Sequence, residues 1–405
     1  MSIPSPWRAD FPIFSVHPEL HYLDAAATAQ RPNEVIEAIG AFQSGGNANV
    51  HRGIYKLAED ATSAYEAARD TVRAFLNAVS LQEIVFLPGA TAGMNFLADT
   101  WGRQNLNSGD EIVISEMEHH AVIVPWTELA RGLGVKIQVA PLTADGQLDM
   151  DAYRALLSPK TKLVLVTAMS NVLGTAPDLE QVGAAAHEAG ALFFTDAAQA
   201  AAHARLDVQA LPVDALVFSS HKVYGDFGSG ALWMRPEQLA ALPPYQRGGS
   251  MIRSVSWEAV EYLDAPHRFE AGTANVVAAI GFAAGLRYLE RAWANGAQAH
   301  ETRLLEDLLE RLGAEEGVRI FGPPSTGARG PIVSFTLEGV HPHDLAQVLD
   351  EHGVAVRAGH HCTQPLHRHL GIPATARASI GVWNDSSDID ALIEGIRDAR
   401  KRFVR

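Results

Sequence analysis

Three polar segments of the chain follow short apolar runs and carry side chains able to bind or transform a ligand. The first is the turn Pro88 to Gly93, where small residues let backbone N–H groups and the Thr91 hydroxyl approach an anion at the positive end of a helix. Such turns are also glycine-rich for packing reasons alone. The second ends in Asp196, which either caps the following helix or holds a heteroaromatic nitrogen in its protonated form.

The third segment, Ser219-Ser220-His221-Lys222, places a lysine directly after an apolar run. Lysines usually lie on solvated faces. A lysine in this position is well placed to be desolvated and to form a Schiff base. Because ligands of open α/β sheets bind at the carboxyl ends of the strands, we expect the turn, Asp196 and Lys222 to meet at one sheet edge.

A pair of histidines, His119 and His120, follows another apolar run. Neighbouring histidines on a helix point about 100° apart, and the HExxH arrangement of zinc proteases is absent from this segment. We therefore interpret His119 as a flat ring that stacks on a flat ligand.

Cys362 is the single cysteine of the chain, so no internal disulfide can form. It ends the segment Arg357-Ala358-Gly359-His360-His361-Cys362. Histidine and cysteine together suggest zinc, but one cysteine beside adjacent histidines lacks the paired spacing of a tetrahedral site, and we predict no metal. Imidazoles and an arginine favour the thiolate of a nucleophile, and the alternative is a structural, buried cysteine.

The composition limits the classes of function. The chain has 405 residues, of which 47% are hydrophobic and 20% charged, so two domains with a sizeable core are expected. Its net charge of −15 disfavours binding to nucleic acids and anionic membranes. No apolar run approaches the roughly 20 residues that cross a bilayer, and the start lacks the pattern of a signal peptide, so we expect a cytoplasmic protein.

Short apolar runs alternate with longer amphipathic stretches from residue 83 onward, which indicates an α/β fold with a mainly parallel sheet. The predicted strands are Ile84 to Leu87, Ile112 to Ser115, Val135 to Ala140, Leu163 to Thr167, Leu192 to Asp196, Ala215 to Ser219 and Ala231 to Met234. Helices are predicted over Leu57 to Leu76 and Leu179 to Ala189.

The pattern changes after about residue 275. A long helical run from Val276 to Leu312 precedes two predicted strands, Ile332 to Leu337 and Val354 to Arg357, and a last helix covers Asp388 to Phe403. We interpret residues 22–275 as a large domain, and residues 1–21 with 276–405 as a smaller α+β domain that carries the Cys362 loop.

An ordered set of motifs covers nearly the whole chain, from Tyr22 to Phe403, and resembles the class V aminotransferase-fold cysteine desulfurases, in particular the group II branch of the SufS and CsdA type, which includes selenocysteine-lyase-like enzymes. The motifs are Ala90-Thr91, Met117-Glu118-His119-His120, Ser170-Asn171-Val172-Leu173-Gly174, Asp196-x-x-Gln199, Ser219-x-His221-Lys222, Phe269-Glu270-Ala271-Gly272-Thr273 and Arg357-x-Gly359-His360-His361-Cys362. The resemblance implies fold type I of the transferases that depend on pyridoxal 5′-phosphate (PLP), with a seven-stranded sheet in the large domain.

The resemblance also implies the residues that bind the cofactor. Lys222 matches the lysine that forms the internal aldimine, Asp196 the partner of the pyridine nitrogen, and His119 the stacked imidazole. The other implied cofactor-binding residues are Ala90, Thr91, Asn171, Gln199, Ser219, His221 and Thr273. Thr273 matches a phosphate ligand donated by the partner subunit, which makes a homodimer functional.

The implied reaction converts L-cysteine to L-alanine. Arg377 and Asn171 match the pair that holds the substrate carboxylate, and Arg357 is a third candidate for substrate binding. Cys362 matches the nucleophile that takes the substrate sulfur as a persulfide. Because the chain has no second cysteine, the sulfur must pass to an external acceptor for iron–sulfur cluster or other sulfur-containing products: a SufE-like or SufU-like protein, or a small thiol.

Several positions depart from the pattern of the family. Ala197 and Ser220 stand where glycine is common, and Gly225-Asp226-Phe227-Gly228 replaces the usual Gly-Pro-x-Gly after the lysine. Two alternatives therefore stay open. One is a selenocysteine lyase or another PLP-dependent C–S lyase, epimerase or kynureninase-like enzyme of the same fold, and the other is a non-catalytic scaffold for sulfur-transfer assembly.

Overall fold

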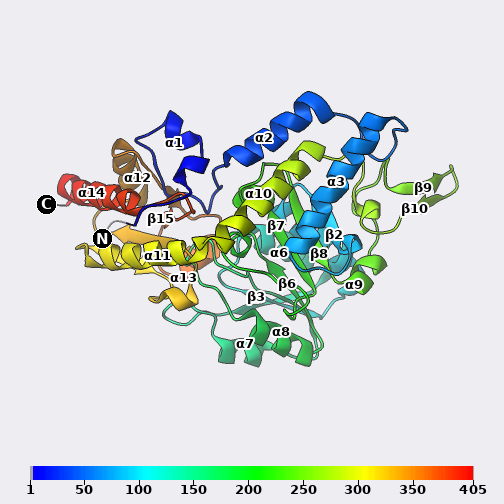
Figure 1. Cartoon of the computed structure of the whole chain (residues 1–405). Helices are drawn as coiled ribbons and strands as arrows, with labels where there is room; N and C mark the ends of the chain where they lie inside the picture. The colour runs from blue at the N-terminus through cyan, green and yellow to red at the C-terminus, as the bar shows by residue number, and fades with distance from the viewer. Residues whose placement is uncertain (1–2, 405) are drawn as a thin grey trace.

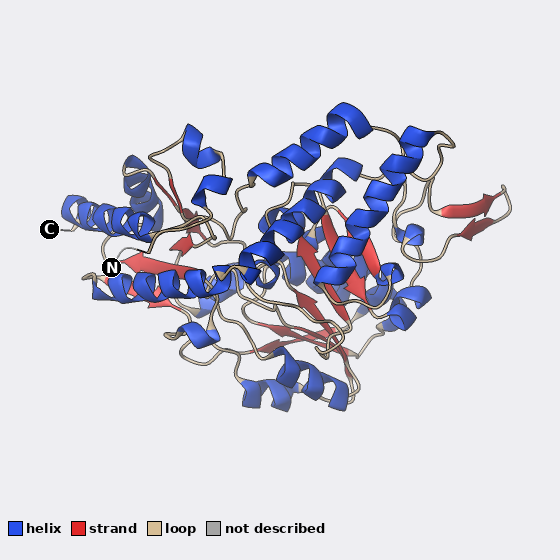
Figure 2. Ribbon diagram, in the orientation of Figure 1, coloured by secondary structure: helices blue, strands red, loops and turns tan. Residues whose placement is uncertain are grey.

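The computed structural model describes residues 3–404 and is built around a seven-stranded sheet of order β2-β8-β7-β6-β5-β3-β4 (Figures 1 and 2). Strands β3 to β7 run parallel to one another, whereas β8 is antiparallel to both of its neighbours. The strands are β2 (Ile84–Leu87), β3 (Glu111–Ser115), β4 (Lys136–Ala140), β5 (Thr161–Leu165), β6 (Leu192–Asp196), β7 (Ala215–Ser219) and β8 (Gly230–Met234). All seven predicted strands and the mainly parallel sheet are confirmed.

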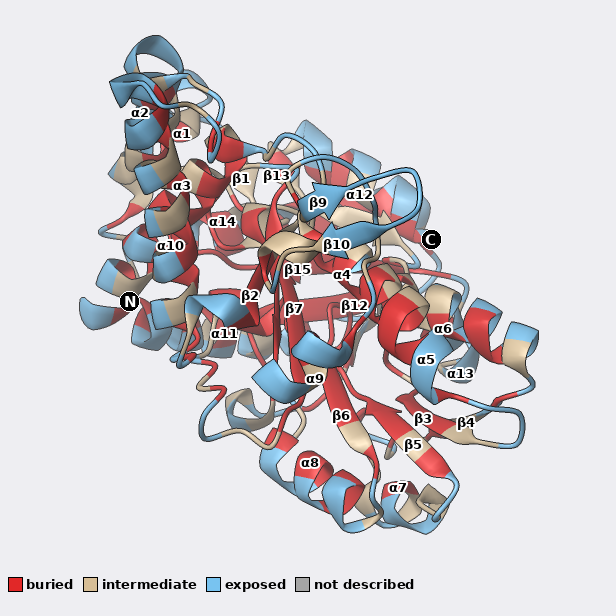
Figure 3. Ribbon diagram, turned by 90° about the vertical axis from the view of Figure 1, so that its right-hand side faces the viewer, coloured by how far each residue is buried: buried red, intermediate tan, exposed pale blue. Residues whose placement is uncertain are grey.

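Helices cover both faces of this sheet, and so its central strands β5 to β8 are buried on both sides (Figure 3). On β7, Leu216 belongs to the core under one face and Val217 to the core under the other, because successive side chains of a strand alternate. One face packs against α4 (Ala90–Leu97), α6 (His120–Leu133) and α9 (Pro236–Ala241). The other packs against α3 (Lys56–Phe75), α7 (Met150–Leu156), α8 (Leu179–Glu188) and α10 (Val276–Ala294).

A second, four-stranded antiparallel sheet of order β11-β12-β15-β14 forms the smaller lobe. Its strands are β11 (Val318–Phe321), β12 (Ile332–Leu337), β15 (Thr375–Ser379) and β14 (Arg357–Gly359). They share a core with α11 (Ala297–Ala314), α12 (Pro342–Glu351) and α14 (Ser386–Phe403). The short strands β1 (His21–Tyr22) and β13 (Val354–Ala355) pair in parallel beside this sheet.

Two predicted elements differ from the structure. The helical run Val276 to Leu312 is divided into α10 and α11 at Gly296, whose φ of +91° is a left-handed conformation that an α-helix cannot contain. The single strand predicted over Val354 to Arg357 is divided into β13 and β14, which pair with different strands. The prediction was wrong at both places because the apolar pattern continues across the break.

The division into domains expected after residue 275 stays a prediction. Helix α10, which follows this position, packs against α3 and α2 (Asn33–Ala41) beside the large sheet. In the N-terminal segment, Phe11 contacts Trp383 of the small lobe and Tyr224 of the large one, which places this segment at the seam of the lobes. The remaining short elements are α1 (Ile13–Val16), α5 (Arg103–Asn105), α13 (Gln364–His369) and the hairpin of β9 (Ile252–Val255) and β10 (Val260–Tyr262).

Among residues 3–404, no helix combines the length and the apolar character that a membrane span requires.

Candidate active site

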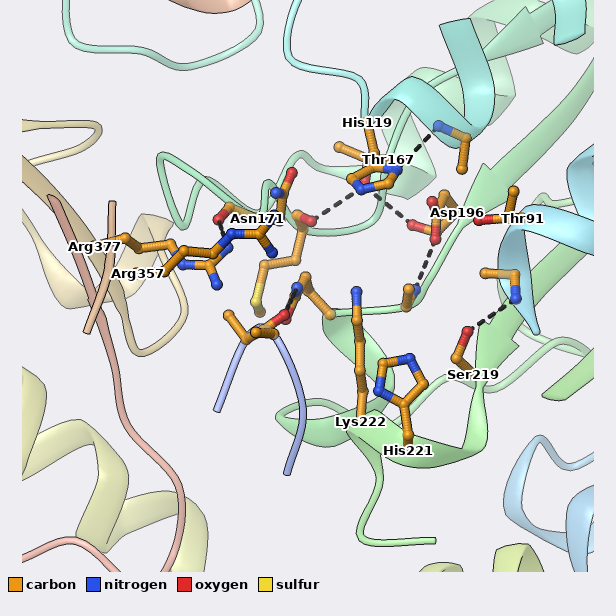
Figure 4. A pocket seen from close by; sticks show the side chains of 17 residues that line it. Thr91, His119, Thr167, Asn171, Asp196, Ser219, His221, Lys222, Arg357 and Arg377 are labelled. Atoms are coloured by element: carbon orange, nitrogen blue, oxygen red, sulfur yellow. Dashed lines mark hydrogen bonds between the residues drawn. The ribbon is translucent and has the colours of Figure 1, made fainter. Parts of the chain in front are cut away.

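A cavity with about 710 Å³ of free space, part of it open to solvent, lies at the carboxyl ends of the parallel strands, between the two lobes (Figure 4). Eleven of the site residues predicted from the sequence line it: Ala90, Thr91, His119, Asn171, Asp196, Gln199, Ser219, His221, Lys222, Arg357 and Arg377. The expected meeting of the turn, the carboxylate and the lysine is confirmed.

One end of the cavity carries hydrogen-bond donors suited to an anion. Helix α4 begins at Ala90, whose N–H donates to Ser219 Oγ at 2.8 Å, and Thr91 lines the cavity one residue further on. A Cβ atom on Gly89 would come within 3.1 Å of Ser219 Oγ, and the φ of Gly89 is +152°, so a small residue without a Cβ fits this close approach. His221, on the same side, has an Nδ1 atom that is buried without a partner among the described residues.

Lys222 and Asp196 face each other across the middle of the cavity (Figure 4). Burial lowers the pKa of the Lys222 amine to about 8, although the charge of Asp196 offsets part of this effect. Burial raises the pKa of Asp196, and Lys222 opposes that shift. Asp196 accepts the N–H of Ala198 through Oδ1 at 2.9 Å, which fixes the carboxylate at the end of β6.

The ring of His119 is neutral and fixed in orientation. His119 caps α6 and accepts the N–H of Ala121 through Nδ1 at 3.0 Å, so its proton resides on Nε2. Burial and the nearby Lys222 lower the pKa of His119 to about 3. A neutral imidazole in the wall of the cavity can stack on an aromatic ligand without carrying a charge next to it.

The opposite end of the cavity contains two arginines. Arg377, on β15, is fully buried and donates to Asp24 Oδ1 and to the carbonyl of Asn171, both at 2.9 Å. Its Nε atom has no partner among the described residues. Arg357, on β14, is the second guanidinium of the lining. This end therefore has unused donors for a second anionic group, such as a carboxylate.

Cys362 lies on a loop that two hydrogen bonds attach to the large lobe. The N–H of His120 donates to the Cys362 carbonyl at 2.8 Å, and the Asn171 amide donates to the His361 carbonyl at 2.7 Å. His361 and Cys362 have φ values of +50° and +59°, an unfavourable region for residues with side chains that is typical of functional loops. Cys362 is partly exposed, and its sulfur lies 3.7 Å from Arg357 Nη2.

Comparisons with known proteins give the family. The model of the family "Aminotransferase class-V" matches residues 21–392. A probable cysteine desulfurase of Streptomyces coelicolor is 45% identical, over 98% of this chain and 97% of the relative, and a cysteine desulfurase of an Enterobacter species is 43% identical over 96% of both. The chain belongs to the class V cysteine desulfurases.

Solved structures of such desulfurases have the same fold. The crystal structure of CsdA from Escherichia coli superposes with a TM-score of 0.91, at 38% identity over 98% of both chains. The apo structure of a cysteine desulfurase from Thermococcus onnurineus gives a TM-score of 0.94, at 37% identity over 100% of this chain and 99% of the other.

Class V cysteine desulfurases use PLP, and the residues of this cavity fit that group. The N-terminus of α4 and the unpartnered Nδ1 of His221 suit a phosphate. Asp196 suits a pyridine nitrogen, and Lys222, with its lowered pKa, suits an imine with an aldehyde. The donor set thus matches the cofactor at one end and in the middle of the cavity.

Thr273 is the remaining cofactor-binding residue predicted for this desulfurase. It does not line the cavity that contains Lys222. It lines a separate cavity with Tyr65 and Glu270, outside the group of residues around Lys222. This placement agrees with the expectation that Thr273 serves the site of a partner subunit, which stays a prediction.

Sequence reasoning missed three polar residues of the desulfurase site. Asp24 binds Arg377, and Thr167 lines the cavity. Glu118 accepts hydrogen bonds from the Ser115 hydroxyl and from the Thr167 N–H. Burial raises the pKa of Glu118 to about 8. The Met117-Glu118-His119-His120 motif contained a signal for Glu118, but nothing in the sequence pairs Asp24 with an arginine so distant along the chain.

The residues after Lys222 that depart from the pattern of the family take part in a stack of side chains beside the active site. Asp226 binds Arg31 at 2.9 Å, and the Arg31 guanidinium lies over the Phe227 ring at 4.4 Å. The Phe227 ring in turn stacks on His221, with centroids 5.4 Å apart and planes 30° from parallel. In this desulfurase, side chains in place of the usual Pro-x thus support the imidazole next to Lys222.

Proposed function

We propose that this protein converts L-cysteine to L-alanine with PLP and holds the released sulfur as a persulfide on Cys362. One observation carries the proposal: the cavity that contains Lys222 and Asp196 also contains Arg357, whose guanidinium reaches the only thiol of the chain. The cysteine desulfurase relatives, at 41–45% identity, support the same activity.

Bound PLP supplies an electron sink for the negative charge that remains on the α-carbon of an amino acid after its proton is removed. Lys222 Nζ would hold the cofactor and would accept the α-proton of the substrate. With a pKa of about 8, its amine exchanges protons readily near neutral pH. Asp196 would pair with the pyridine nitrogen, and the neutral His119 ring would stack on the cofactor.

The arginine end of the cavity orients the substrate. The unpartnered Nε of Arg377 and the Arg357 guanidinium bind the carboxylate of L-cysteine. Asp24 and the Asn171 carbonyl fix the Arg377 side chain through its two Nη atoms. The carboxylate is thereby held at the end of the cavity from which Cys362 approaches.

The sulfur step uses the thiol of Cys362. Its sulfur attacks the substrate sulfur, the S–S bond forms as the Cβ–S bond breaks, and the carbon keeps the electron pair and takes a proton. L-cysteine and an enzyme thiol thus become L-alanine and an enzyme persulfide, with atoms and electrons balanced and no added oxidant. Arg357, at 3.7 Å, is close enough to stabilise negative charge on the attacking sulfur.

An external acceptor and a second subunit complete the proposed reaction. Because Cys362 is the only cysteine, the sulfur passes to a SufE-like or SufU-like protein or to a small thiol, and from there to iron–sulfur clusters or another sulfur-containing product. Thr273 binds the cofactor phosphate of the partner in a homodimer. Its position away from the Lys222 cavity of its own chain supports this arrangement.

The direct test is turnover by the purified, PLP-loaded protein. We expect a yellow protein that releases alanine from L-cysteine, with sulfide produced in the presence of a reductant. Cys362→Ala should keep the colour and lose sulfur transfer. Parallel assays with selenocysteine, cysteine sulfinate and cystine identify the preferred substrate, and sulfur transfer by Cys362→Ala at the wild-type rate would contradict the persulfide step.

A further inference from the structure

Three side chains outside the active site converge beside the middle of α3. His51 precedes α3, Glu66 lies on it, and His267 begins the short helical turn His267–Phe269. Each offers one ligand atom, and these atoms all lie within 4.8 Å of one another. His51 Nε2 is 2.9 Å from Glu66 Oε1, and the two imidazoles meet edge to face with centroids 5.2 Å apart.

The charges around this cluster leave one carboxylate in excess. The fully buried Arg69 binds Glu270 through both Nη atoms, at 2.6 and 2.9 Å, and also donates to Glu66 from Nε at 3.0 Å. Glu270 thus supplies the counter-charge of Arg69, and Glu66 adds a further negative charge. A cation beside Glu66 would restore the balance at this position.

Access and geometry also suit an ion. Glu66 and His267 line a groove that is open to solvent, which provides an entry path and a water for a fourth ligand. Ligand atoms of a tetrahedral zinc ion lie about 3.3 Å apart, and the existing 2.9 Å between His51 and Glu66 is close to this spacing. The His267 ligand atom lies within 4.8 Å of the other two.

From this arrangement we propose that His51, Glu66 and His267 bind a divalent transition-metal ion of the zinc class, with water as the fourth ligand. Two imidazoles and a carboxylate form a ligand set that zinc prefers over magnesium or calcium, which take oxygen ligands. The ion joins α3 to the segment that leads into Glu270 and Thr273. It is independent of the proposed desulfurase chemistry.

The test uses PLP-loaded protein with Cys362→Ala, so that the only thiol cannot bind the metal. Zinc is titrated by isothermal calorimetry, and bound metal is counted after dialysis. We expect one zinc ion per chain, a rise in melting temperature with zinc, and no binding of magnesium. His267→Ala and Glu66→Gln should each weaken zinc binding at least about tenfold, because loss of a direct ligand costs more than loss of a supporting group.

A matched control is the exposed pair His341 and His343, which meet edge to face with centroids 5.0 Å apart in the small lobe. The double variant H341A/H343A should bind zinc as the parent does. Melting curves without metal check that each variant is folded. The proposal is overturned if the Cys362→Ala protein binds no zinc, or if His267→Ala and Glu66→Gln leave its affinity unchanged.

Discussion

Arg357 Nη2 lies 3.7 Å from the sulfur of Cys362, and the same guanidinium lines the cavity that contains Lys222. One side chain therefore contacts both the loop that bears the thiol and the site where the amino acid binds. Arg357 lies on β14 and Cys362 on the loop that follows it, so the small lobe positions both groups against the large one.

Replacement of Arg357 tests this link. Hydrogen bonds to charged groups contribute about 1.5–3 kcal/mol, so Arg357→Gln should lower kcat/KM for alanine release about 10- to 100-fold. The absorbance of bound PLP should stay, because the cofactor donors lie at the other end of the cavity. Arg368→Ala, an exposed arginine on α13, is the control and should retain the wild-type rate. An equal loss in both variants would argue against a specific role.

The lowered pKa of Lys222 predicts how cofactor uptake depends on pH. With a pKa of about 8, the amine is about one-tenth neutral at pH 7 and about nine-tenths neutral at pH 9. Since only the neutral amine reacts with an aldehyde, the rate at which apoprotein takes up PLP should rise about tenfold over this range and then level. Stopped-flow absorbance measures the rate of PLP uptake at each pH, and Lys222→Ala serves as the blank. A rise of about a hundredfold without a plateau would indicate an ordinary lysine.

The stack of Arg31, Phe227 and His221 predicts an effect on PLP retention. Aromatic stacking and cation–π contacts contribute about 0.5–1.5 kcal/mol, so Phe227→Ala should raise the Kd of PLP roughly two- to tenfold by releasing His221. Equilibrium dialysis gives the Kd. Trp257→Ala removes another exposed aromatic ring, one that is fully solvated, and should leave the Kd unchanged. If both variants retain PLP like the wild type, the stack does not support the site.

The role of Thr273 is tested by mixing two impaired variants. If Thr273 serves the partner, a heterodimer of Lys222→Ala and Thr273→Ala contains one intact site. Random exchange of equal amounts should then recover about a quarter of the wild-type alanine release, because half of the dimers are mixed and each has one good site. Each variant dimerised with itself is the control. If no activity returns after subunit exchange has been verified, Thr273 serves the active site of its own subunit.

The sequence predicted the large sheet well because its strands are short runs of apolar residues between Gly, Asp and Pro. It missed β15, Thr375–Ser379, whose residues are all buried although the segment Thr-Ala-Arg-Ala-Ser contains no large apolar side chain. Such a strand is recognised only through its partners, β12 and β14. An alternation of apolar and polar residues indicates a strand with one buried face. This strand has no such alternation, and the strands that bury it are distant in the chain.

The site was predicted chiefly from the resemblance to the family. The positions of Asp196 and Lys222 at the sheet edge were predicted without the resemblance, because each of these polar residues follows an apolar run at the end of a predicted strand. The Arg377–Asp24 pair and the edge-to-face histidines at Glu66 depend on contacts between segments that no local pattern connects. The roles of the lining residues stay predictions that the variants above can test.

The most direct test of the account is the mass of the intact protein after a single turnover with L-cysteine, without reductant or acceptor. We predict the addition of one sulfur atom per chain to the wild type, located on the peptide that contains Cys362, together with one alanine released per site. Cys362→Ala should show no added mass. Alanine release with no sulfur on Cys362, or an equal gain of mass in Cys362→Ala, would contradict the account.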